Sequence, residues 1–116
     1  MLVGHSLGSV VAYDLLRREL APRVMALVTL GSPLAWPRVR RALDAAASPA
    51  DISRGESWSN VFDPWDVVTA GKGLAPRAVD YPVNNGRDPH ALVGYLSQAE
   101  TGTVVLAVAR SAGGGR

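Results

Sequence analysis

The chain has 116 residues, with 12 Lys and Arg, 10 Asp and Glu, 2 His and no Cys, which gives a formal net charge of +2. This length fits one globular domain, and the hydrophobic content of 47% is enough to form a core. The absence of Cys excludes disulfides, thiolate metal sites and cysteine nucleophiles.

The first third of the chain predicts a strand, a helix and a second strand. Met1–His5 is a short apolar strand end, and the apolar run Val24–Leu30 predicts a strand that is buried on both faces. Between them, helical spacing predicts an amphipathic helix from Leu7 to about Leu20, which ends near Pro22. Its expected core face is Val11, Ala12, Leu15, Leu16 and Leu20, and its expected polar face is Ser9, Asp14, Arg17 and Arg18. A strand, a helix and a strand in this order indicate a parallel crossover.

Two more strands are expected in the middle of the chain. Residues Pro37–Ala47 predict a helix, and the Pro, Gly and Ser content of Ser48–Ser57 predicts a loop. Trp58–Phe62 is a third strand and Ala78–Val83 a fourth.

The last segment is expected to be mainly helical. A helix is predicted from about His90 to Gln98, after the turn-rich stretch that ends at Pro89. Thr103–Ala109 predicts a helix or a strand, because its β-branched residues leave both open. We expect one domain over residues 1–110 and a disordered tail over 111–116.

One motif indicates nucleophilic chemistry. Gly4-His5-Ser6-Leu7-Gly8 matches G-x-S-x-G and lies between a predicted strand and a predicted helix, which is the setting of a nucleophile elbow. The tight turn strains the serine backbone and needs small neighbours, so we expect Gly4 and Gly8 to give clearance. The backbone N–H of Leu7 is by position an oxyanion donor.

A serine nucleophile needs a base and an acid. His5 is adjacent to Ser6, so its side chain should point away from Oγ and serve in packing or hydrogen bonding; His90 remains as the base. Asp66 and Asp63 both follow the third predicted strand and can supply the acid. Asp66 is favoured because it lies past the strand in Asp-Val-Val, whereas Asp63 precedes Pro64 and can cap the turn. Asp80, within a strand, and Asp88, next to the base, are weaker candidates.

Four segments in this order resemble the second half of an α/β-hydrolase of the lipase and esterase kind: GHSLGSVVAYDLL, TLGSPL, WSNVFDPWDVV and HALVGYL. The resemblance implies a partial α/β-hydrolase fold, a parallel sheet with flanking helices. It also implies Ser6 as nucleophile, Asp66 as acid, His90 as base and the Leu7 amide in the oxyanion hole. Thioesterases with a similar elbow often carry the acid after the next strand, where Gly31-Ser32-Pro33 has no carboxylate, so the esterase-like arrangement is favoured.

The chain departs from this family at its beginning. A complete α/β-hydrolase has several strands before the elbow, whereas here three residues precede Gly4. We therefore expect a fragment, or a start at an internal Met, with an exposed apolar edge on the first strand.

The predicted function is hydrolysis of carboxylic esters by a serine hydrolase. The alternatives are an acyltransferase or thioesterase with the same three residues, and a non-catalytic fragment or interaction module. We expect a small-molecule ester or acyl substrate, no metal or other cofactor, and no nucleic-acid partner, since Arg38, Arg40 and Arg41 are typical of a solvated helix face. No apolar run has the length of about 20 residues that a membrane span needs. Without an export signal, which a missing N-terminus could have carried, the default location is the cytoplasm.

Overall fold

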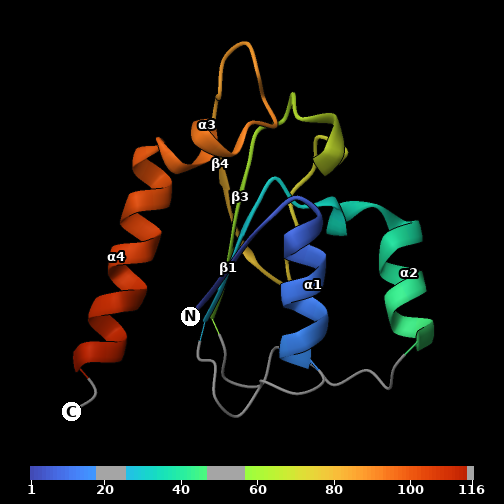
Figure 1. Cartoon of the computed structure of the whole chain (residues 1–116), viewed down its shortest axis with the longest axis horizontal. Coiled ribbons are helices and arrows are strands. Elements are labelled where there is room, and N and C mark those ends of the chain that lie inside the picture. The colour runs from blue at the N-terminus through green and yellow to red at the C-terminus, as the bar shows by residue number, and fades with distance from the viewer. Residues whose placement is uncertain (18–25, 47–56, 115–116) are drawn as a thin grey trace.

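The computed structural model describes residues 1–17, 26–46 and 57–114 (Figure 1). The predicted end of the first helix near Leu20 and Pro22, and residues 48–56 of the predicted loop Ser48–Ser57, lie outside the described residues. Ser57, the last residue of that predicted loop, begins a strand instead.

The centre of the fold is a parallel sheet of four strands in the order β1-β2-β3-β4. The strands are β1 (Leu2–His5), β2 (Ala26–Leu30), β3 (Ser57–Phe62) and β4 (Val79–Pro82). All four predicted strands are thus confirmed in the described residues, while Val24 and Met25, the predicted start of the second strand, lie outside them. Because the strands are parallel, the residues that follow them meet at one edge of the sheet.

Helices cover both faces of this sheet, which gives an α/β arrangement. Figure 1 shows α1 (Leu7–Leu15) and α2 (Pro37–Ala46) on one face and α4 (Ala99–Gly114) on the other, with the short α3 (Leu92–Leu96) near the carboxyl ends of the strands. Short 3-10 turns follow β2 and β3: η2 (Pro33–Ala35) and η3 (Val67–Thr69). In the described ranges, every helix is too short or too polar to cross a lipid bilayer.

The last two predicted segments have boundaries that differ from those of the structure. The helix expected over His90–Gln98 is shorter, because Ala91 has an extended backbone as the N-cap of α3 and His90 stays in the preceding turn. Helix α4 decides the open choice at Thr103–Ala109 in favour of a helix. It continues to Gly114, into the segment expected to be a disordered tail, while 115–116 lie outside the described residues.

Each face of the sheet has its own hydrophobic core. On the α1 side, Leu27 of β2 packs with Leu16, Trp58 and other residues. On the α4 side, Val28 and Leu30 pack with a second set that includes Tyr95 and Val104. Every residue of β2 is buried, so the strand shows no alternation of apolar and polar residues. This burial on both faces was predicted from its apolar run.

The predicted faces of α1 are partly wrong. Ser9 and Arg17, expected in solvent, are buried, whereas Val11 and Leu15, expected in the core, are exposed. The buried polar groups have partners: Ser9 Oγ donates to the Ser6 carbonyl oxygen at 2.6 Å, and Arg17 donates to the Leu43 carbonyl oxygen at 2.8 Å. Burial of a hydrogen-bonded polar group costs little free energy, so these two side chains of the expected polar face can lie inside the fold.

Candidate active site

Ser6 lies in the tight turn between β1 and α1, in a backbone conformation that side-chain-bearing residues rarely adopt. Its φ is 57° and its ψ is −127°. Such a conformation costs about 1–3 kcal/mol and persists only where neighbouring contacts hold it. Here the Ser6 N–H donates to the Leu30 carbonyl oxygen at 3.0 Å, and Ser9 Oγ holds the Ser6 carbonyl. The turn therefore fixes Ser6 at the carboxyl end of β1.

The two glycines of the motif have different roles. A Cβ atom added at Gly4 would lie 2.6 Å from the Cα atom of Ser9 and 2.8 Å from the carbonyl oxygen of Gly8, both of which are backbone atoms. A Cβ atom at Gly8 would meet no atom within 4 Å. The clearance expected of both glycines is thus needed at Gly4 only, where the start of α1 passes against the end of β1.

This difference predicts opposite effects on stability. Gly4→Ala should lower the free energy of unfolding by about 1–3 kcal/mol, because backbone atoms must move to admit the methyl group. Gly8→Ala should raise it by about 0.5–1 kcal/mol, since alanine restricts the unfolded chain more than glycine does and has the higher helix propensity. Urea unfolding followed by circular dichroism measures both, and equal stability of the two variants would contradict the tight approach at Gly4.

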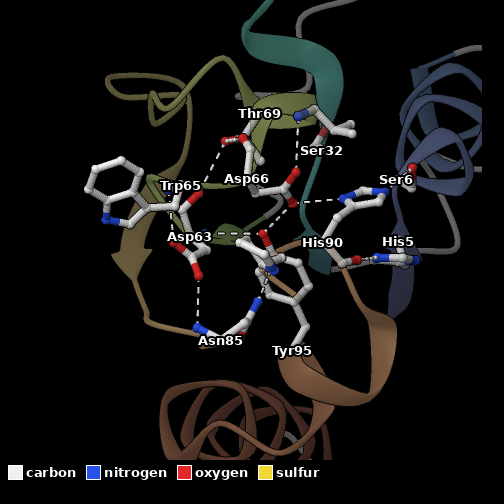
Figure 2. A network of polar contacts seen from close by, with 12 residues as sticks. His5, Ser6, Ser32, Asp63, Trp65, Asp66, Thr69, Asn85, His90 and Tyr95 are labelled. Carbon is white, nitrogen blue, oxygen red and sulfur yellow. Dashed lines mark hydrogen bonds and ion pairs between the residues drawn. The ribbon is translucent and has the colours of Figure 1, made fainter. Parts of the chain in front are cut away.

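Ser6, His90 and Asp66 form one hydrogen-bonded series at the carboxyl ends of the strands (Figure 2). The Ser6 Oγ atom lies 2.8 Å from His90 Nε2, and His90 Nδ1 lies 2.7 Å from Asp66 Oδ2. An ionised carboxylate only accepts hydrogen bonds, so Nδ1 carries the proton of the neutral ring. The lone pair of Nε2 then faces the Ser6 hydroxyl, which donates to it.

Asp66 is fully buried and anchored at both carboxylate oxygens. Oδ1 accepts from the Val68 N–H at 3.0 Å, which makes Asp66 the N-cap of η3. Oδ2 accepts from the Tyr95 hydroxyl at 2.7 Å as well as from His90. These donors compensate the cost of burying the carboxylate.

Asp63, the second candidate for the acid, has a different environment. Its Oδ1 accepts from the Trp65 N–H at 2.9 Å, and its Oδ2 accepts from the Asn85 N–H at 2.7 Å. The first bond lies within the loop after β3, and the second connects that loop to the loop that carries His90. The structure therefore brings Asp66 to the imidazole and gives Asp63 the turn contacts that the sequence also allowed.

The remaining aspartates considered from the sequence are not part of this series. Asp80 accepts from the Leu74 and Ala75 N–H groups at 2.8 and 2.9 Å and from Asn60 Nδ2 at 3.0 Å, so it holds the segment before β4. Asp88 accepts through its carbonyl oxygen from the Ala91 N–H in the turn that carries His90.

His5 supports His90 through its backbone. His5 Nε2 donates to the His90 carbonyl oxygen at 2.8 Å, and the two rings stack with their centroids 4.8 Å apart. The predicted packing and hydrogen-bonding role of His5 is confirmed. The residue next to the serine thus connects the elbow with the loop of the base.

Sequence reasoning missed two residues near Asp66. Tyr95 is fully buried, and burial raises the pKa of its phenol above the ordinary value of 10.0. Gly31 has a φ of 58°, and a Cβ atom there would lie 2.7 Å from Tyr95 Cε2 and 2.9 Å from Asp66 Oδ2. In the sequence, the position of Gly31 before Ser32-Pro33 indicates only a turn. Nothing near Gly31 in the sequence indicates that Asp66 and Tyr95 pack against it.

Other predicted features lie around this series. Leu7 is the first residue of α1, directly after Ser6, and an amide at this position has no partner within its own helix. Of the three tryptophans, Trp58 is buried, whereas Trp36 is 45% and Trp65 81% exposed. The Nε1 atom of Trp36 donates to the Val68 carbonyl oxygen at 2.8 Å.

Comparison of the chain with protein-family models, with curated proteins and with solved structures finds no match. The resemblance to α/β-hydrolases therefore stays a prediction, which rests on the motifs of the chain. Among the described residues, no group of three or more His, Asp or Glu side chains is placed to hold a metal ion.

Proposed function

We propose that the chain is a serine hydrolase that acts on carboxylic esters through Ser6, His90 and Asp66. The observation that carries the proposal is the continuous series from Ser6 Oγ through His90 to the buried Asp66, with contacts of 2.8 and 2.7 Å. It begins at a serine held in a strained turn between a strand and a helix, where a nucleophile is exposed to substrate.

Acylation uses each member of the series. Ser6 Oγ attacks the carbonyl carbon of the ester while His90 Nε2 takes the hydroxyl proton, and Asp66 stabilises the imidazolium that forms. The oxyanion lies near the amino end of α1, where the Leu7 N–H and the helix dipole favour negative charge. The C–O bond to the alcohol then breaks, and His90 returns its proton to the leaving oxygen.

Deacylation repeats these steps with water. A water molecule gives its proton to His90 Nε2 and attacks the acyl carbon, and the carboxylic acid leaves as Ser6 Oγ regains the proton. The imidazole of His90 is one third exposed, so water reaches it in the described structure. No cofactor is needed for either step.

Pre-steady-state hydrolysis of p-nitrophenyl acetate tests the two-step reaction. We expect a burst of p-nitrophenol equimolar with the folded chain, because p-nitrophenol is a good leaving group and the acyl-enzyme forms faster than it is hydrolysed. The burst should vanish in Ser6→Ala. Hydrolysis by the folded wild-type chain at the rate of buffer alone would contradict the proposal.

The same residues also support transfer of the acyl group to another acceptor, an alcohol or a thiol. The acceptor is selected by the surroundings of the acyl-enzyme and not by the series itself. Adding a primary alcohol or a thiol to the burst assay distinguishes the two reactions: an increase in the ester or thioester product at the expense of acetate favours a transferase.

An interaction module is the second candidate function, and the edge strand favours it. In the described sheet, β1 has β2 as its neighbour on one side, and Val3 is 47% exposed. Apolar edge strands pair with other chains. Size-exclusion chromatography with light scattering tests this candidate: a monomer that unfolds cooperatively argues against it, and a stable assembly that Val3→Lys dissolves supports it.

A further inference from the structure

Tyr95 touches the one carboxylate that the proposed reaction uses, although neither the motif nor the spacing of the chain marks it. Its ring lies in the core beneath the site, in the cluster with Leu30 and Val61, and its hydroxyl reaches Asp66 (Figure 2). We propose that Tyr95 is a positioning residue, whose hydroxyl aims Asp66 Oδ2 at His90 and keeps this carboxylate from holding the imidazolium proton too tightly. This inference rests on the proposed function.

The direction of the hydroxyl proton follows from the backbone. The Asp63 N–H donates to the Tyr95 oxygen at 3.1 Å, so that oxygen is an acceptor on one side. The single phenolic proton is then directed to Asp66 Oδ2 at 2.7 Å. A short series results, from the Asp63 N–H through the Tyr95 hydroxyl to Asp66 and on to His90.

The surroundings keep this hydroxyl neutral and in place. Burial raises the pKa of the phenol, so Tyr95 acts as a donor over the whole working range of a histidine base. Gly31 makes the contact possible, because a Cβ atom there would lie 2.7 Å from the Tyr95 ring. Tyr95 also lies only five residues after His90. His90 is in the turn before α3 and Tyr95 is in α3, so one short segment positions both side chains.

The chemical effect is on the balance of charge at Oδ2. This oxygen shares its negative charge between the phenol and the His90 Nδ1–H. Without the phenol, the carboxylate would hold the imidazolium more strongly and would be less restricted in its rotation. A purely structural role for Tyr95 would lower stability and leave the pH dependence of the reaction unchanged.

The test uses the rate at which a fluorophosphonate probe labels the chain between pH 5 and 9. Tyr95→Phe removes only the hydroxyl, and we expect labelling about tenfold slower per folded chain, as for the loss of a hydrogen bond to a charged group. The acidic limb of the rate profile should also move to higher pH. Tyr13→Phe is the matched control, because Tyr13 is buried in the other core and its hydroxyl accepts from Arg77 at 3.5 Å.

The outcomes separate this inference from the proposed function. A slower, shifted profile in Tyr95→Phe with an unchanged profile in Tyr13→Phe supports the role of Tyr95. Equal rates and equal profiles in Tyr95→Phe and wild type overturn it while the proposed function stands. Absence of Ser6-dependent labelling in the wild type overturns the proposed function, and the positioning role of Tyr95 with it.

A second measurement needs neither activity nor a folded Tyr95 variant. In wild-type chain labelled with carbon-13 at the tyrosine Cζ atoms, the Tyr95 signal should move with the same midpoint as the titration of His90. The movement should disappear in His90→Ala. A Tyr95 signal that stays constant while His90 titrates would show that the phenol does not sense the Asp66–His90 pair, and would overturn the inference.

Discussion

Ser6→Ala is expected to lower the hydrolysis of p-nitrophenyl acetate by about a thousandfold or more, to the rate of background catalysis. The reason is that Oγ forms the covalent bond to the acyl group, and no described side chain near His90 Nε2 replaces it. Stopped-flow and steady-state rates measure the effect. Ser57→Ala is the matched control. Ser57 is exposed at the amino end of β3, whereas the site lies at the carboxyl ends of the strands.

His90→Ala should cost as much as Ser6→Ala, and the double variant should cost little more than either. Residues that act as one unit in a reaction are not additive, since the loss of one leaves the other without a function. If the rate reduction in the double variant equalled the product of the two single reductions, the transfer of a proton from Ser6 to His90 would be contradicted.

Asp66→Asn is expected to reduce the rate on the order of a thousandfold, with the fold retained. The amide can turn its NH₂ group toward His90 Nδ1, and the ring then carries its proton on Nε2 instead. In that tautomer the imidazole donates to Ser6 Oγ and cannot accept its proton. Rates of fluorophosphonate labelling and of ester hydrolysis should fall together.

Asp63→Asn distinguishes the two candidate acids. Asp63 accepts hydrogen bonds from the Trp65 and Asn85 backbone, so its replacement should lower the free energy of unfolding by about 1–2 kcal/mol. Thermal unfolding measures this loss of stability. The rate of ester hydrolysis per folded chain should change by less than about tenfold. A larger loss of rate in Asp63→Asn than in Asp66→Asn would assign the acid to Asp63.

The sequence predicts the sheet well because its strands differ sharply from their surroundings. The apolar run of β2 is bounded by proline and glycine, and burial on both faces requires such a run. The faces of α1 are harder to predict, because the buried Ser9 and Arg17 side chains make hydrogen bonds to residues 32 and 43, which are distant in the sequence. Such long-range contacts leave no trace in helical periodicity.

The residues of the site also differ in how far the sequence predicts them. Ser6 and Gly4 lie in a local motif, and His90 follows because His5, the other histidine, is adjacent to the serine. The choice between Asp63 and Asp66 depends on the turn after β3, where two residues separate carboxylates that contact different parts of the loop between β4 and α3. Tyr95 and Gly31 could not be predicted, because their contact exists only after β2, β3 and α3 have come together.

The central claim is that Ser6 is a nucleophile activated by His90. Its most direct test is labelling of the purified chain with a fluorophosphonate probe, followed by peptide mapping in a mass spectrometer. We predict one phosphonate on Ser6, with labelling abolished in Ser6→Ala and reduced about a thousandfold in His90→Ala. A folded chain that stays unlabelled, or one whose labelling survives both substitutions, would contradict the claim.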